Sequence, residues 1–518
     1  MEDSGGAQDG DPSDSSSSKE RLGLEIIDIV SDGDVLLDVT FETSKETLRA
    51  AKKAAAAAAR PRPGQAQRNG VDDARPAMLK PKVRRGYRVH LDTLKRHSKY
   101  FNNLLGDTRF AEAKSILSAF ERLSLRNVKP SEADPHDLPL VKIEEDDEAT
   151  QSAGQETIFE DLLRILHGKD VITAPKSITM QYLAILAVMA DRFDCVSPVS
   201  RYVNSGLKFK WPATQTRLSS AVRGTQEHSH PAALTKQGEE TLRQKILVSW
   251  LLDQPLKMQA ATRELIMYGS RKWASYAPDD EIEEDGDSAA WWDLPDNLEQ
   301  ELQYRRECVL NTIASIPRHF LQLYMSRGTR QCKLGYDSSS SCDSYQLGEM
   351  IKFLSNRKLL ILVDFGTNSL DNLNTLGQFA TVEIQHLVSL LKNCPSYQID
   401  KNHTNCGLRT RILPVLEYMQ AMMSSNAVAI SRASWKKDRE STSWFPNAEG
   451  SLNGRVRQKE IFRFTRAMAG DQRFRYENMM ATDRLARELF TAEEWNWTAD
   501  ESAGAEEEQQ RFTPRLKF

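Results

Sequence analysis

The chain has 518 residues, of which 40% are hydrophobic, and its 69 Lys and Arg residues nearly balance its 73 Asp and Glu residues. This length predicts two or three domains, each large enough to bury a core. A net charge of −4 over the whole chain gives no support for nucleic acid or a membrane surface as a bulk partner.

The N-terminal segment and the cysteine content indicate where the protein works. Residues 1–20 are mostly Asp, Ser and Gly, so we expect a disordered tail over 1–30 without a secretion signal. The longest apolar run, 183–190, is far shorter than the roughly 20 residues that cross a bilayer. Six cysteines in so long a chain indicate a reducing compartment. We expect an intracellular protein of the nucleus, the cytoplasm or both, without a membrane partner.

Two short strand patterns lie on either side of a long basic segment. The first covers 33–41 and is opened by the turn dipeptide Asp32-Gly33. The second begins at Tyr87 and continues into a helical pattern. The apolar and small residues of that pattern recur at three- and four-residue steps: Leu91, Leu94, Ser98, Phe101 and Leu105. A hairpin that leads into a helix predicts a small α/β unit.

This order of elements resembles the BTB/POZ family of protein–protein interaction domains. The matching residues are Asp34 and Val35 in the first strand, His90 after the second, and Leu94, Ser98, Tyr100, Phe101 and Leu105 in the helix. A third strand at 140–143, followed by acidic residues, and a helix led by Phe159 come next in the same order. Residues 186–193 are similar to the family's Leu-Ala-x-x-Ala-Asp-x-Phe pattern. The resemblance covers 31–205.

The resemblance implies a docking module with two modes of use. One is a homodimer formed through the first strand and helix, and the other is docking of a cullin-type ubiquitin-ligase scaffold on the helices at 98–105 and 159–167. The interaction residues that it implies are Asp34, Val35, His90, Leu94, Ser98, Tyr100, Phe101, Leu105 and Phe159. Apolar burial would drive either mode, at about 1.5–3 kcal/mol for each large side chain that is fully buried.

Two features depart from the family's pattern. A basic insert, 42–86, interrupts the hairpin, and a polar loop is expected at 107–138. Lengthening a hairpin loop costs only about 0.6 kcal/mol per doubling, so we expect the strands to pair. Leu91 stands where BTB transcription factors commonly carry a basic residue, which argues against the repressor-recruiting form of the function.

The basic insert suggests an alternative function. It carries twelve Lys and Arg against four Asp and Glu, a net charge of +8, and its densest part is 80–85. Such a segment fits a nuclear regulator associated with transcription or chromatin, but it fits a solvated surface loop equally well. No aromatic residue is interleaved with the basic ones, so stacking on nucleic-acid bases is not supported.

The remainder of the chain reads as mainly helical. A linker is expected at 206–238, a helical domain at 239–450, and a charged helix followed by an acidic disordered tail at 451–518. Residues 358–364 fit a lone strand or a buried helical segment, and the spacing of their apolar residues does not distinguish the two. This half resembles the long helical region attached to BTB domains in filamentous-fungal proteins, a resemblance that brings no known activity. The fold class expected overall is α+β.

One group of residues has metal-ligand character. The candidates lie in two loops and are Cys332, Cys342, Cys394, His403 and Cys406. Four of them would close a tetrahedral structural zinc site, and a metal would order loops that bury little apolar surface. Neither Cys-to-Cys spacing is the tight Cys-x2–4-Cys of most zinc sites, so reduced, buried structural cysteines remain the other interpretation.

No pattern of an enzyme is present. The chain lacks a Gly-rich phosphate loop, a Gly-x-Ser-x-Gly elbow and a His-Glu-x-x-His helix. His90 has no evident catalytic partner and is expected to pack where strand meets helix. We therefore expect a non-enzymatic BTB adaptor or scaffold without catalytic residues and without a cofactor, apart from the zinc ion considered above. An enzyme in the helical half would need a polar pocket lined by residues from 294–425.

Overall fold

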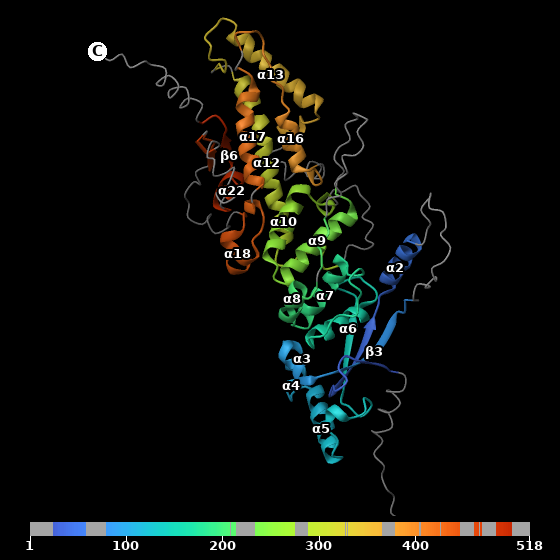
Figure 1. Cartoon of the computed structure of the whole chain (residues 1–518). Coiled ribbons are helices and arrows are strands. Elements are labelled where there is room, and N and C mark those ends of the chain that lie inside the picture. The colour runs from blue at the N-terminus through green and yellow to red at the C-terminus, as the bar shows by residue number, and fades with distance from the viewer. Residues whose placement is uncertain are drawn as a thin grey trace, which may run out of the picture. The chain divides into compact units, whose positions relative to one another are not determined.

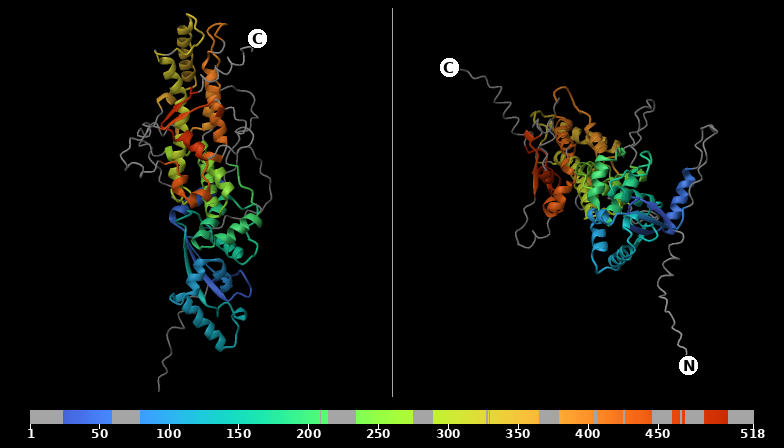
Figure 2. Two further views of the ribbon diagram at one scale, coloured as in Figure 1. Left: turned by 90° about the vertical axis from the view of Figure 1, so that its left-hand side faces the viewer. Right: turned by 60° about the horizontal axis from the view of Figure 1, so that its bottom comes forward.

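The computed structural model shows a mixed α+β protein that divides into two compact units, with the main boundary at Pro212. It describes residues 24–58, 79–207, 209–213, 234–274, 289–326, 328, 330–364, 379–403, 406–424, 426–445, 460–465, 467–468 and 483–499. The expected acidic C-terminal tail, most of the expected N-terminal tail and the centre of the linker lie outside these residues. Unit 1 contains the N-terminal segments and unit 2 most of the remainder (Figures 1 and 2).

A four-stranded sheet forms the centre of unit 1. Its strands are β1 (Glu25–Asp28), β2 (Val35–Glu42), β3 (Lys82–Val89) and β4 (Leu140–Asp146), and they lie in the order β1-β3-β2-β4. Strands β2 and β3 are antiparallel, β4 runs parallel to β2, and β1 runs parallel to β3. Most of β2 is buried because it lies between two other strands. The predicted pairing of the first two strand segments is confirmed.

The pairing of β2 with β3 extends over eight residues, from Val35 opposite Val89 to Glu42 opposite Lys82. Charged side chains reinforce it. Arg84 donates two hydrogen bonds to the buried carboxylate of Asp38, at 2.8 and 2.6 Å. The insert therefore begins after Glu42, but its basic end belongs to the sheet. A helix, α2 (Lys45–Ala58), forms the start of the insert.

Helices surround the sheet of unit 1. They are α3 (Leu91–His97), α4 (Lys99–Gly106), α5 (Ala111–Leu125), α6 (Gln155–Leu166), α7 (Met180–Arg192) and α8 (Val196–Ser205), with a 3₁₀ turn, η1, at Pro130–Glu132. Helices α3 and α4 replace the single helix expected after the second strand. The break is at Ser98, whose hydroxyl accepts from Phe101 N at 3.0 Å and donates to Phe193 O at 2.6 Å. Ser98 thus caps α4.

Two expectations for unit 1 are corrected. Strand β1 forms within the segment expected to be disordered, where its residues hydrogen-bond to the backbone of β3. Helix α5 occupies the middle of the expected polar loop at 107–138. It buries Ile116, Leu123 and two alanines on one side, and its many polar residues face solvent, which explains why composition suggested a loop.

An aromatic cluster forms the centre of the core of unit 1. Phe101 stacks on Phe193 with ring centroids 5.4 Å apart, and Phe159 meets Phe193 edge-on at the same distance. Tyr87 of β3 lies 5.5 Å from the ring of Phe159. Each of these four rings is buried. Contacts of this kind contribute about 0.5–1.5 kcal/mol beyond the burial of area, so they join α4, α6 and the end of α7 to the sheet.

Unit 2 is built from helices, as expected. They are α9 (Lys236–Leu251), α10 (Pro255–Tyr268), α11 (Arg271–Ala274), α12 (Leu298–Met325), α13 (Ser339–Asn356), α14 (Ile361–Asp364), α16 (Ile384–Lys392), α17 (Leu408–Ser424), the 3₁₀ turn η3 (Asn426–Val428), α18 (Arg432–Lys437), α19 (Arg439–Thr442) and α22 (Asp483–Phe490). The long helix α12 contributes to the same core as α13, α16 and α17 (Figure 1). Helix α14 shows that the ambiguous segment 358–364 ends in a helical turn.

One expectation for unit 2 is corrected. A charged helix was predicted to lead into the C-terminal tail, but the described part of that segment contains a small parallel sheet. Its strands are β5 (Ile461–Arg463) and β6 (Glu494–Asn496), and only α22 between them is helical over several residues. Phe462 of β5 packs in the core with Trp497, their rings 6.1 Å apart. Burial of these aromatic rings overrides the helical preference of the charged residues around them.

Buried ion pairs fix the helices of unit 2. Arg243 of α9 is inaccessible to solvent and contacts Glu239 at 3.0 Å and Glu299 of α12 at 2.7 Å. Arg305 of α12 pairs with Glu301 at 2.7 Å and donates to three backbone carbonyls. A buried charge without its partner would be costly, commonly by about 3–5 kcal/mol. These pairs therefore specify which helices meet.

The turn before β2 gives a test of the sheet. A Cβ atom on Gly33 would lie 2.8 Å from the backbone nitrogen of Val89 and 2.8 Å from Cγ of Arg88. The substitution Gly33→Ala is therefore expected to cost about 1–3 kcal/mol. Hydrogen exchange of the β2 and β3 amides in the full chain should accelerate by roughly five- to a hundredfold.

Gly348→Ala on α13 is the matched control, since nothing lies within 4 Å of the added methyl group. It should leave exchange in β2 and β3 unchanged. Equal exchange in the Gly33 variant and the native chain would contradict the close approach at this turn.

Candidate functional site

Most of the expected interaction residues lie in the core of unit 1. Six of them are buried, namely Val35, Leu94, Ser98, Phe101, Leu105 and Phe159. Asp34 and His90 are partly buried, and only Tyr100 is exposed, at 38%. Side chains that are covered by their own unit do not contact a partner directly. The six buried residues therefore act by shaping the surface around them.

Asp34 and His90 join the strands to the helices. The carboxylate of Asp34 accepts from Leu91 N at 2.8 Å, at the start of α3. The backbone N–H of His90 donates to Nε2 of His167 at 3.1 Å, so Nδ1 of His167 carries the proton and donates to Leu163 O at 2.8 Å. Burial lowers the pKa of His167, which favours this neutral form. This arrangement holds α3 and α6 together, and Nε2 of the His90 ring lies 3.2 Å from the carboxylate of Asp32.

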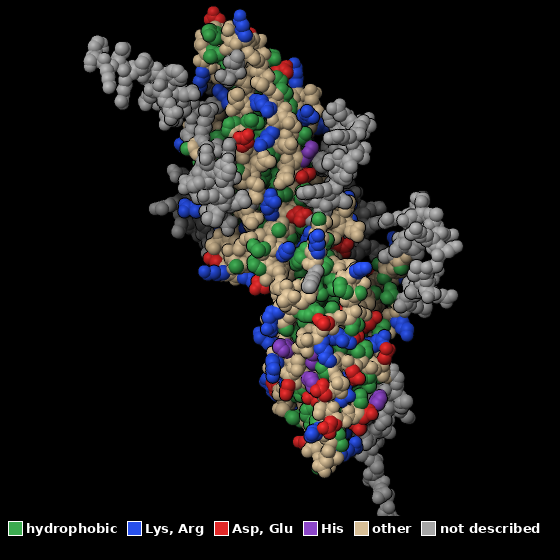
Figure 3. Space-filling model, in the orientation of Figure 1, with side chains coloured by type: hydrophobic (Ala, Val, Ile, Leu, Met, Phe, Trp, Pro, Cys, Tyr) green, Lys and Arg blue, Asp and Glu red, His purple; other side chains and the backbone are tan. Residues whose placement is uncertain are grey.

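An exposed apolar surface lies on the helices that follow. We call it the α4–α5 surface and define it by Tyr100, Phe110 and Leu117, which are 38%, 43% and 50% exposed. Phe110 and Leu117 are seven residues apart, a spacing that places them on one side of a helix. Tyr100 rests edge-on against Phe193, at 5.3 Å. Elsewhere on the visible face of unit 1, acidic and basic side chains are interspersed (Figure 3).

Two members of this surface were missed in the sequence. Phe110 and Leu117 were assigned to a polar loop, although Phe110 is the N-cap residue of α5 and Leu117 lies within this helix. The signal that could have found them is the helical spacing of Ile116 and Leu123 with the small residues between. That spacing indicates which side of the helix is buried. The two exposed apolar residues then stand out on the other side.

A buried carboxylate lies close to Tyr100. Glu145 of β4 is 4% exposed, and its Oε2 lies 3.3 Å from Nη1 of Arg192. Burial raises the pKa of Glu145 to about 7, against the opposing effect of the Arg192 charge; the neighbouring Asp146 carboxylate raises it further. This carboxyl group therefore gains a proton within the range of physiological pH.

The raised pKa of Glu145 makes the stability of unit 1 depend on pH. Because the folded state holds the proton more tightly than the unfolded state, stability should fall as pH rises from about 4.5 to about 7 and then level off. Glu145→Gln should remove this fall, which amounts to at most about 3 kcal/mol. Hydrogen-exchange protection of the β4 amides, measured at about pH 5 and about pH 8, gives the comparison.

Glu144→Gln changes the exposed neighbour on the same strand and serves as the control. It should retain the pH dependence of the native chain. A native chain whose β4 protection does not differ between the two pH values would contradict the assignment to Glu145.

The densest part of the basic insert is already paired within the sheet. Lys82 lies 2.6 Å from Glu42, Arg84 pairs with Asp38, and Arg85 pairs with Glu25. Partial neutralisation of these cations reduces the charge that they present to a phosphate backbone. The nuclear, chromatin-associated alternative therefore rests more on α2 and on residues 59–78, which lie outside the described residues. It stays a prediction.

In unit 2, four of the five candidate metal ligands lie together. They are Cys332, Cys342, His403 and Cys406, and their ligand atoms all lie within 4.8 Å of one another. Nδ1 of His403 is 3.5 Å from Sγ of Cys332 and 3.6 Å from Sγ of Cys406. The Sγ atoms of Cys332 and Cys406 are 3.6 Å apart. Only Cys406 is partly exposed, and the other three side chains are buried.

Cys394 does not belong to this cluster. Its thiol is buried and donates to Pro395 O at 3.7 Å, and burial raises its pKa to about 11. Within the cluster, burial and the neighbouring thiolates of Cys406 and Cys332 raise the pKa of Cys342 to about 12. Burial also acts to raise the pKa of Cys332, but hydrogen bonds from Ser339 and from the backbone of Leu334, followed by those from Cys406 and His403, outweigh it and lower that pKa.

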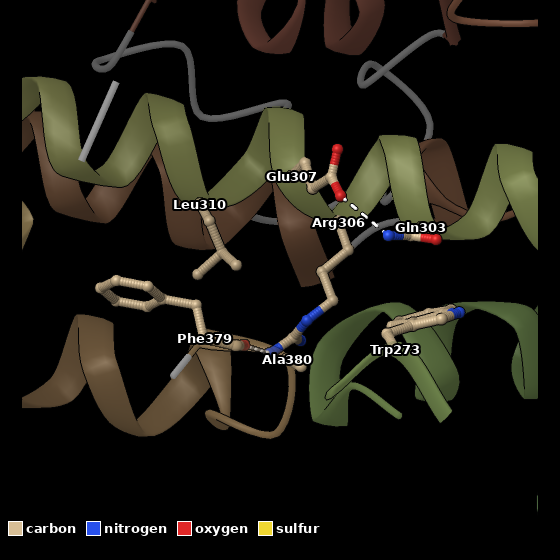
Figure 4. A pocket seen from close by; sticks show the side chains of 7 residues that line it. All are labelled: Trp273, Gln303, Arg306, Glu307, Leu310, Phe379 and Ala380. Atoms are coloured by element: carbon tan, nitrogen blue, oxygen red, sulfur yellow. Dashed lines mark hydrogen bonds between the residues drawn. The ribbon is translucent and has the colours of Figure 1, made fainter. Parts of the chain in front are cut away.

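The helical half has a small pocket within the range where an enzyme site was considered. It lies beside α12 and is lined by Trp273, Gln303, Arg306, Glu307, Leu310, Phe379 and Ala380 (Figure 4). Its internal space is about 20 Å³, which is room for about one water molecule. The Arg306 side chain crosses this space and donates to the carbonyls of Phe379 and Val382. This pocket has no room for a substrate larger than water. A wider, open depression of about 350 Å³ in the same range is lined by Lys392, Glu417, Gln420, Ala421 and Ser424.

The remaining observations concern the whole chain. Among the described residues, no helix has both the length and the apolar character that a membrane crossing requires. Comparison of the chain with protein-family models, curated proteins and solved structures finds no match. The resemblance to BTB/POZ domains therefore rests on the residues and on the order of the elements.

Proposed function

We propose that the chain is a non-enzymatic protein–protein interaction protein, an adaptor or scaffold whose unit 1 is a docking module of the BTB type. Unit 2 then holds a second partner. The observation that carries the proposal is the order of the elements in unit 1. An antiparallel pair, β2 and β3, leads into two short helices, and a third strand lies parallel to the first of the pair.

The helices that follow support the same proposal. Helix α6 carries Phe159, and α7 carries the segment with the Leu-Ala-x-x-Ala-Asp-x-Phe pattern and is followed by α8. Phe193 at the end of that pattern packs on both Phe101 and Phe159. Residues that were recognised separately in the sequence thus meet in one core. This is the behaviour expected of a single domain with that pattern.

The α4–α5 surface is the part of unit 1 that we assign to docking. Tyr100 lies on α4, within the helical segment 98–105 that the resemblance associates with partner binding. Phe110 and Leu117 extend the exposed apolar surface to α5, which the resemblance does not include. A second copy of the chain is the proposed occupant, because a homodimer is the first mode that the resemblance implies. A cullin-type ubiquitin-ligase scaffold is the other outcome of the test.

Introduction of negative charge into this surface tests the proposal. The double substitution Phe110→Asp and Leu117→Asp should weaken self-association of the full chain by about 3 kcal/mol, or roughly a hundredfold in Kd. Sedimentation of the purified chain over a range of concentrations measures the effect. Both residues are exposed in unit 1, so the folded structure should be retained.

Leu256→Asp on α10 is the matched control, since Leu256 is 78% exposed and belongs to unit 2. It should leave self-association unchanged. The tagged chain, captured from its own cells, should be weighed by native mass spectrometry. A monomer without any bound protein would overturn the adaptor function, and a stoichiometric complex with a cullin would replace the second copy as the occupant.

A further inference from the structure

Three separate segments of unit 2 meet at the cluster of thiols and imidazole. Cys332 lies after the end of α12, Cys342 is in the first turn of α13, and His403 and Cys406 precede α17. The first and last of these residues are 74 positions apart in the chain. Chance proximity of four such side chains is uncommon in a chain with only six cysteines and nine histidines.

The distances fit the edges of a coordination tetrahedron. Zinc–sulfur bonds of about 2.3 Å and zinc–nitrogen bonds of about 2.0–2.1 Å place neighbouring ligand atoms about 3.5–3.8 Å apart. The three closest pairs among Cys332, His403 and Cys406 lie at 3.5, 3.6 and 3.6 Å. The remaining atom, from Cys342, lies within 4.8 Å of the others. A small adjustment of that side chain would complete the tetrahedron.

The surroundings orient the ligands as a metal site requires. Nε2 of His403 lies 3.0 Å from Oγ of Ser338, a partner that leaves Nδ1 directed at the thiols. The carboxylate of Asp343 accepts from the backbone N–H groups of Gln331 and Cys332, at 2.8 Å each. These bonds hold the loop that carries Cys332. The closely spaced pair of ligands at this site is His403-x2-Cys406, in place of the Cys-x2-Cys of many zinc sites.

We propose that Cys332, Cys342, His403 and Cys406 bind one zinc ion in a closed structural site. Three thiolates and one imidazole favour zinc over hard cations such as Mg²⁺ or Ca²⁺. Four protein ligands leave no position for a substrate, and three of the four are buried, so the role is structural. The ion joins the first turn of α13 to the loop after the C-terminus of α12 and to the loop before the N-terminus of α17.

The site explains how polar segments are held at this end of unit 2. The described residues of these segments, 330–338, 396–403 and 406–407, contain few buried apolar side chains besides Cys332. They therefore have little hydrophobic burial to hold them. A bound ion supplies the missing free energy through coordination. Two other states of the same residues are distinguishable by experiment. One is a set of reduced thiols without metal, and the other is a disulfide between Cys332 and Cys406.

Metal analysis of the native chain is the first test. The full chain, purified under reducing conditions without chelator, should contain about one zinc ion per chain. Replacement of zinc by Co²⁺ should give the visible absorption of a tetrahedral cobalt site with thiolate ligands. A native chain that contains less than about a tenth of an ion, and that takes up neither metal when it is added, would overturn the proposal. A Cys332–Cys406 disulfide found by mass spectrometry under these conditions would also overturn it.

Paired cysteine substitutions locate the site. Cys406→Ser should lower the zinc content at least about tenfold and should raise the rate of proteolysis within 330–338 and 396–407 by a similar factor. Cys394→Ser is the matched control, because Cys394 is close in sequence but outside the cluster. It should keep its zinc. Equal loss of metal from both variants would place the ion elsewhere and overturn the assignment. If Cys406→Ser does not fold, the cobalt spectrum of the native chain decides.

Discussion

The pairing of β2 with β3 is the constraint on which the rest of unit 1 depends. Eight residues of each strand pair across an insert of 39 positions, counted between Glu42 and Lys82. The connection adds little cost because closure entropy grows only with the logarithm of loop length. The register places Tyr87 over Phe159 and brings the end of β3 to the start of α3. The aromatic core and the helices follow from that placement.

This arrangement separates residues that hold the domain from residues that can meet a partner. Phe101 and Tyr100 are adjacent on α4, yet the first is inaccessible and the second is 38% exposed. Helix α5 extends the exposed side through Phe110 and Leu117. Docking would therefore use side chains next to the recognisable pattern rather than the pattern itself. The residues of the BTB-like pattern mainly form the core of unit 1. A partner would contact the α4–α5 surface, which this core supports.

Unit 2 differs from unit 1 in that its helices bury several charged side chains, which require partners in the interior. Arg243, Arg305 and Arg306 are all buried, and each donates to a carboxylate or a backbone carbonyl of another segment, although Nε of Arg306 has no hydrogen-bond partner among the described residues. Such partners specify which helices meet, since an unpaired buried charge is costly. The cluster that contains Cys342 and His403 is likewise held by contacts between polar side chains. It lies where residues 330–338 and the segment before α17 have few apolar contacts.

The sequence by itself determined three of the strands of unit 1 and the pairing of the first two, the helical segment that starts after His90, and the mainly helical second half. These follow from residue periodicity and from strand and turn preferences, which act over short distances. Only the tertiary structure decided that Phe101 is covered while Leu117 is not, and that His403 joins three cysteines while Cys394 stays apart. Periodicity shows that a side of a helix is apolar, but what covers that side, and which distant ligands meet, depends on the packing of the whole chain.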